Sequence, residues 1–135
     1  MNRGKIIIVA LLAIALFSIL SLVCGASYLE ILLPGGLPIG NALAALGLIA
    51  VAGTAVALSV RGTALRIMSL ASLLAAAAWL PVSVALAGNP ALNFGEGRGL
   101  IWLVLSLAVA AGAFCALLWA LVARALPKRR HRRAG

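Results

Sequence analysis

Residues 6–29 read IIIVALLAIALFSILSLVCGASYL, a run without a charged side chain. About 20 apolar residues are enough for a helix to cross a hydrocarbon core of about 30 Å. The run does not alternate between polar and apolar residues as a barrel strand would. It also exceeds the apolar region of a secretory signal, which has about 7–15 residues. Because a helix satisfies its own backbone hydrogen bonds in lipid, the run predicts a retained transmembrane helix.

Three more charge-free runs follow, at residues 37–60, 67–87 and 100–123. Each is long enough to cross a membrane as a helix. The links between the runs are short and rich in Gly and Pro, and short links make consecutive helices antiparallel neighbours. We therefore predict an all-α integral membrane protein, a four-transmembrane-helix bundle of up-down-up-down topology. One membrane domain would cover residues 1–135, with a basic tail at residues 124–135.

The few charged residues predict the orientation of the chain. The composition is 65% hydrophobic and 10% charged, with eleven Lys and Arg against two acidic residues, Glu30 and Glu96. Placing the N-terminus inside puts all basic residues except Arg98 in the cytoplasm, and both glutamates outside. This is the bias of the positive-inside rule, so we predict that both termini are cytoplasmic (N-in/C-in). The Ala-, Leu- and Arg-rich composition and short loops favour a multi-pass protein of the bacterial cytoplasmic (inner) membrane.

Small residues recur every four positions in the fourth run. They are Ala108, Gly112, Ala116 and Ala120. Such a stripe lets a second membrane helix approach closely, which predicts helix packing there. The contact could lie inside the bundle, or the stripe could be a docking face for another subunit. Looser sets of small residues occur in the second run (Gly40, Ala44, Gly47, Val51) and in the first (Ser18, Ser21, Gly25).

Trp79 and Pro81 are the most unusual residues inside the runs. Trp79 lies about 18 Å along the third run from its start next to Arg66, deeper than the interfacial belt where Trp is common. Pro81 cannot donate to the carbonyl of Ala77 and is expected to kink the helix. A kink beside a large ring predicts an intramembrane pocket, for a lipid, quinone or pigment, or a hinge. The alternative is a space-filling ring beside a tolerated proline.

The chemistry that the runs lack excludes several functions. No Asp, Glu, Lys, Arg or His lies in the central part of any run, whereas ion-coupled pumps and proton relays usually hold such a group at depth. No carboxylate pair, and no Ser or Cys with a neighbouring base, is available for catalysis. Cys24 and Cys115 have no metal-ligand spacing, and a predicted depth difference of about 15 Å is too large for a disulfide. We predict no enzyme activity, cofactor or metal.

A polybasic tail follows the last run and comprises Lys128, Arg129, Arg130, Arg132 and Arg133. It could serve only to orient the chain, or it could bind anionic lipid head groups or an acidic partner surface. We do not expect the tail to bind nucleic acid.

Two functions remain from the sequence. The leading hypothesis is an accessory or structural subunit of a larger membrane complex, because the chain is nearly all membrane and offers small-residue helix faces to other membrane subunits. The alternative is a small homo-oligomeric transporter, channel or holin-like pore. A pore needs a polar lining, which only the serines and Asn41 could supply.

Overall fold

The computed structural model describes residues 2–25 and 27–126, and this part of the chain is all-helical. Its elements are α1 (Arg3–Val23), the short 3-10 helix η1 (Ser27–Glu30), α2 (Ile39–Leu58), α3 (Ala64–Ala87) and α4 (Arg98–Ala125). The four α-helices are long and apolar enough to cross a membrane. The predicted all-helical class and the four candidate spans are therefore confirmed.

The helix ends differ from the limits of the charge-free runs. α1 ends at Val23 rather than at residue 29, because Gly25 adopts a left-handed conformation (φ +57°). The N–H of Cys24 bonds to the carbonyl of Leu20 at 2.9 Å, and that of Gly25 bonds to Leu22 at 3.3 Å. A left-handed glycine of this kind commonly closes a helix C-terminus.

α3 begins before its charge-free run, at Ala64. The hydroxyl of Thr63 accepts a hydrogen bond from the backbone N–H of Arg66 at 3.2 Å. This side chain caps one of the N–H groups that the first turn leaves unpaired. Arginine is a good helix former, so Arg66 continues the helix in its first turn.

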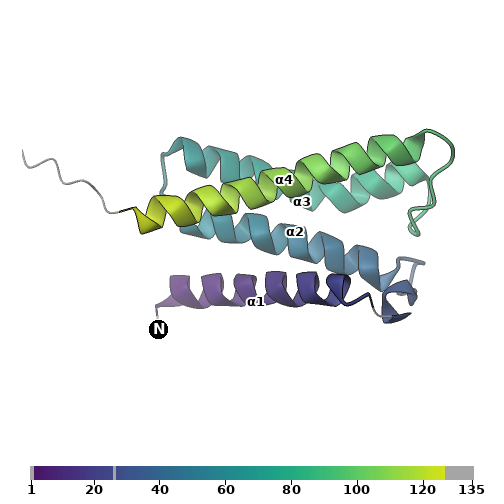
Figure 1. The fold of residues 1–135 in the computed structure, drawn as a ribbon, viewed down its shortest axis with the longest axis horizontal. Coiled ribbons are helices and arrows are strands. Elements are labelled where there is room, and N and C mark those ends of the chain that lie inside the picture. Colours follow the sequence, from purple (N-terminus) through teal and green to yellow (C-terminus); the bar gives the residue numbers. More distant parts are fainter. Residues whose placement is uncertain (1, 26, 127–135) are drawn as a thin grey trace, which may run out of the picture.

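α2 is the central helix of the fold. It contacts each of the other three long helices, and α3 also contacts α4. Figure 1 shows α1 along one side of α2, with α3 and α4 on the other side. Within the described residues, no comparably extensive contact joins α1 to α3 or α4. The fold is therefore a three-helix cluster of α2, α3 and α4, with α1 packed against α2.

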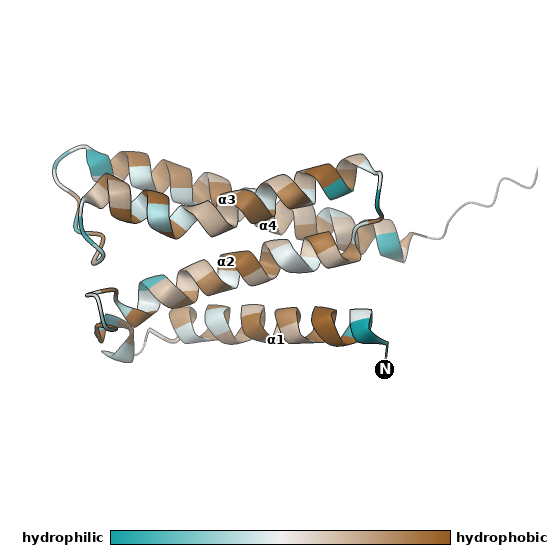
Figure 2. Cartoon of the chain, turned by 180° about the vertical axis from the view of Figure 1, so that it is seen from behind, coloured by the Kyte–Doolittle hydropathy of each residue, from teal (hydrophilic) through white to brown (hydrophobic). Residues whose placement is uncertain are grey.

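Small side chains fill the core, and large apolar ones face outward. The main buried cluster consists of Ala15, Ala50, Val51, Ala52, Ala76 and Ala113. By contrast, Ile67, Leu74 and Leu107 are 70%, 72% and 61% exposed. Figure 2 shows apolar residues along each long helix, with the hydrophilic ones mostly near the ends. An apolar surface of this extent is unusual for a soluble monomer and is typical of a protein surface that contacts lipid or another protein.

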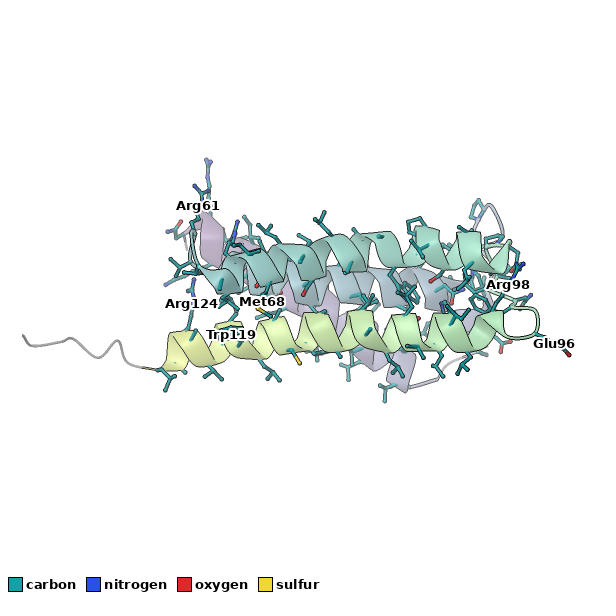
Figure 3. The ribbon with its side chains drawn as sticks, turned by 90° about the horizontal axis from the view of Figure 1, so that it is seen from above. Arg61, Met68, Glu96, Arg98, Trp119 and Arg124 are labelled. Carbon is teal, nitrogen blue, oxygen red and sulfur yellow. The ribbon has the colours of Figure 1, made fainter. Side chains whose placement is uncertain are left out.

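The two ends of the molecule differ in charge. Arg61 and Arg124 lie at one end in Figure 3, and Glu96 and Arg98 lie at the other. The N-terminus lies at the same end as the α2–α3 connection (Figure 1). We call these the basic end and the glutamate end.

Two arginines close the C-terminus of α2 at the basic end. The Nη1 group of Arg66 in α3 donates to the carbonyl oxygen of Val56. The Nε group of Arg124 in α4 donates to the carbonyl oxygen of Leu58 at 3.0 Å. The last four carbonyls of a helix lack partners within it, and positive charge there is favourable. These two side chains thus join three helices at one end.

Candidate functional site

An apolar groove lies between α1 and α4, with α2 as its floor. Its volume is about 300 Å³. The floor carries Ala44, Gly47, Leu48 and Val51, and α1 contributes Ser18, Ile19 and Leu22. The wall on the other side includes Leu103, Leu107, Ala110 and Phe114 of α4 and the ring of Trp79. We call this cavity the α1–α4 groove. It exists because α1 packs on α2 and leaves the flank of α4 uncovered.

Gly47 in α2 lies directly against Ser18 in α1. A Cβ atom added to Gly47 would lie 3.1 Å from the Cβ of Ser18, a distance tighter than ordinary van der Waals contact. Ser18 is fully buried, and its hydroxyl has no hydrogen-bond partner within the described part of the chain. Serine hydroxyls in helices often bond to a carbonyl of the preceding turn. The hydroxyl of Ser18 is instead buried beside Gly47 without a partner in the described residues.

Two tryptophans join α3 and α4 through reciprocal hydrogen bonds. The indole N–H of Trp79 donates to the hydroxyl of Ser106 at 2.8 Å. The indole N–H of Trp102 donates to the hydroxyl of Ser83 at 3.0 Å. The two ring centroids are 6.4 Å apart, with an interplanar angle of 42°. A buried tryptophan usually needs such a partner for its N–H, so the two pairs fix the relative position of these helices.

The sequence carries a signal for these pairs that charge and length do not reveal. In both α3 and α4 a tryptophan precedes a serine by four residues, as Trp79 precedes Ser83 and Trp102 precedes Ser106. Residues four apart lie on one face of a helix. Two such faces, placed antiparallel, bring each ring to the serine of the other helix.

The two residues predicted to form a pocket or hinge, Trp79 and Pro81, lie in different surroundings in the structure. Trp79 is 5% exposed and borders the α1–α4 groove. Pro81 is exposed and does not line the groove. α3 continues as one helix through Pro81, from Ala64 to Ala87. Of the pair, Trp79 borders this groove and Pro81 does not, and a hinge at Pro81 stays a prediction.

The small-residue stripe of α4 is divided between buried and exposed positions. Ala116 and Ala120 are buried, whereas Ala108 and Gly112 are exposed. With 3.6 residues per turn, each step of four residues rotates the position by about 40°, so the stripe turns away from its neighbours along the helix. Gly112 still meets α3 through its backbone, because its carbonyl accepts a hydrogen bond from the hydroxyl of Ser72 at 3.3 Å.

A second cavity of about 300 Å³ lies at the basic end. Its lining joins the end of α2, the start of α3 and the last turns of α4, and we call it the basic-end cavity. The apolar part includes Leu58, Leu65, Trp119, Ala120 and Ala123, and Thr63 and Arg124 add polar groups. The predicted lipid-binding residues of the tail, Lys128, Arg129, Arg130, Arg132 and Arg133, lie outside the described residues.

The remaining chemistry of the described residues is sparse. Across residues 2–25 and 27–126, no group of three or more His, Cys, Asp and Glu side chains could hold a metal ion. Cys24 and Cys115 are both free and exposed. Comparison with protein-family models, with curated proteins and with solved structures finds no match for the chain. The α1–α4 groove, the basic-end cavity and the apolar helix faces are therefore the features of the described residues suited to binding a partner or a ligand.

Proposed function

We propose that this chain is an accessory or structural subunit of a larger membrane complex, and that a transmembrane helix of a partner subunit occupies the α1–α4 groove. The observation that carries this proposal is the groove itself, in which a floor with small residues lies between walls of large apolar side chains. Membrane helices associate by close packing at such small residues, because burial of apolar surface gives no net drive within lipid.

The proposal includes insertion in a membrane with both termini in the cytoplasm. The outward-facing apolar side chains of all four helices support insertion. The basic end carries Arg61 and Arg66 in addition to Arg124, and by the positive-inside rule it would face the cytoplasm. The glutamate end would then face the outside of the cell. We propose the bacterial cytoplasmic membrane as the location, with the four helices in up-down-up-down order.

The hydroxyl groups favour a subunit over a pore. A homo-oligomeric transporter, channel or pore needs polar groups along a continuous face, yet several hydroxyls bond within the chain. Thr54 donates to the carbonyl of Ala50 at 2.7 Å, and Ser83 and Ser106 accept the two indole N–H groups. Hydroxyls engaged in this way offer little to a permeating ion.

Photo-crosslinking from the full-length chain in its native membrane tests the proposal. A photoreactive amino acid in place of Leu107 reports on the groove, and one in place of Leu118 is the matched control. Both leucines are 61% exposed, but only Leu107 lines the groove. We expect position 107 to form a discrete product with a different membrane protein, and position 118 to form none. A product between two copies of the chain would favour the homo-oligomer instead, and lipid adducts alone would refute docking in the groove.

A steric variant completes the test. Ala110→Leu adds bulk inside the groove, whereas Ala111→Leu adds the same bulk at an exposed position that does not line it. The two positions are about 100° apart around the helix. We expect only Ala110→Leu to abolish the crosslink from position 107. Equal crosslinking in both variants would mean that the partner does not enter the groove.

A further inference from the structure

We infer that the basic-end cavity binds one anionic phospholipid, with the phosphate at Arg124 and part of an acyl chain against the apolar wall. This inference concerns a site apart from the α1–α4 groove. It rests on the proposed insertion in a membrane, and it does not require a partner subunit.

The cavity opens onto the surface that would face lipid. Val60 and Trp119, which border it, are 65% and 48% exposed. Leu65 and Ala120 lie deeper and are buried. A cavity of about 300 Å³ with an apolar wall and a few polar groups is at the small end of the range for ligand sites. The cavity is therefore suited to part of one lipid acyl chain, with one polar head group at its rim.

Arg124 supplies the charged group at the rim. Its Nε donates to the carbonyl of Leu58 at 3.0 Å, which holds the guanidinium against the end of α2. This bond uses one of the five N–H donors of a guanidinium, and the planar group matches the oxygens of a phosphate. Trp119 lies five residues before Arg124, about 7.5 Å along the helix. A tryptophan near the head-group level and an arginine beyond it are typical of a membrane interface.

Charge complementarity decides in favour of an anionic lipid. The whole chain has only two acidic residues, Glu30 and Glu96. Glu96 lies at the glutamate end in Figure 3, opposite Arg61 and Arg124. Arg61 and Arg66 directly follow the lining residues Val60 and Leu65 in sequence and add positive charge at this end, so a zwitterionic head group would gain less there than an anionic one. An acidic peptide would match the charge but would leave the apolar wall facing lipid.

Native mass spectrometry of the full chain in mild detergent tests this inference. The chain is titrated with phosphatidylglycerol or phosphatidylcholine of identical acyl chains. We expect one phosphatidylglycerol to bind in preference to phosphatidylcholine. Arg124→Gln should weaken that binding about fivefold, the effect of one basic residue near an anionic lipid. Arg61→Gln removes the same charge from the exposed α2–α3 connection and should change the affinity less. Equal losses in the two variants, or no preference for phosphatidylglycerol, would overturn the site.

A second variant tests the site even if the Arg124→Gln protein does not fold. Ala123 is exposed and lines the cavity, so Ala123→Phe fills the apolar part while leaving the arginines in place. We expect it to weaken phosphatidylglycerol binding, and we expect excess inorganic phosphate not to displace the lipid. Unchanged binding by Ala123→Phe would refute the acyl-chain contact, and displacement by phosphate would indicate a simple anion site. Ala110→Leu should bind the lipid normally, so failure here is distinct from failure of subunit docking.

Discussion

Trp79 donates its indole N–H to the hydroxyl of Ser106, 2.8 Å away on the neighbouring helix. The pair lies beside the α1–α4 groove, since both residues border that cavity. Together with the bond from Trp102 to Ser83, it holds α3 against α4 at two points. The wall of the groove is therefore held in place, and such preorganisation lowers the cost of binding another helix.

Removing the serine acceptor of the Trp79 pair should destabilise the protein more than a change to an exposed tryptophan. Ser106→Ala leaves the buried N–H of Trp79 without a partner, at a cost of about 1–3 kcal/mol. Trp119→Phe is the control, because Trp119 is 48% exposed and should contribute less. Thermal unfolding in detergent measures the difference. A double-mutant cycle with Trp79→Phe isolates the bond, and a coupling energy near zero would refute its role.

Gly47→Ala should weaken the packing of α1 on α2. The added Cβ would lie 3.1 Å from the Cβ of Ser18, and overpacking of this kind costs about 1–3 kcal/mol. Gly53→Ala is the matched control, because its Cβ would meet the side chain of Leu11 at 3.6 Å, an ordinary contact. Both substitutions gain the same helix propensity. Thermal unfolding in detergent should therefore show that the Gly47→Ala variant is less stable than the Gly53→Ala variant. The opposite order would contradict the close approach of Gly47 to Ser18.

The two cysteines should differ in their reaction with a membrane-impermeant maleimide. The sequence places Cys24 about five residues inside a helix, whereas in the structure it is the C-cap residue of α1. Cys115 lies seventeen residues beyond Arg98, about 26 Å along α4. We expect labelling of Cys24 from the outer face of intact cells and none of Cys115. Non-reducing mass spectrometry should find no Cys24–Cys115 peptide. Equal labelling of both thiols would contradict the placement of α4 in lipid.

Reporter fusions should reveal the orientation of the chain. A reporter active only in the cytoplasm should work when fused after Arg133 and fail when inserted at residues 95–99. The reason is the excess of basic residues at one end, which the positive-inside rule keeps in the cytoplasm. A reversed pattern would overturn the orientation and, with it, the leaflet assigned to the basic-end cavity.

The charge-free runs predict the number of long helices, because helix formation in lipid depends on length and apolar content. The same runs misplace the end of α1, since its end depends on the left-handed Gly25 rather than on charge. The start of α3 depends in the same way on the hydroxyl of Thr63. Local backbone geometry and capping determine where these helices begin and end, and apolar content does not report them.

The candidate site was predictable only in part. The depth of Trp79 indicates a residue that borders a cavity, but the position of α1 does not follow from the sequence. When every face of a helix is apolar, no periodic pattern shows which face meets which neighbour. The small-residue stripe of α4 illustrates this, because its regular spacing includes both the buried Ala116 and the exposed Ala108.

The presence of α1 beside α2 would determine whether the chain crosses the membrane an odd or an even number of times. In the proposed topology the packed cluster of α2, α3 and α4 crosses the membrane an odd number of times. Such a cluster alone would leave its two ends in different compartments. In that topology α1 adds one more crossing and would place Arg3 and Lys5 on the cytoplasmic side proposed for both termini. α1, which also contributes Ala15 to the main buried cluster, therefore makes the number of crossings even in that topology.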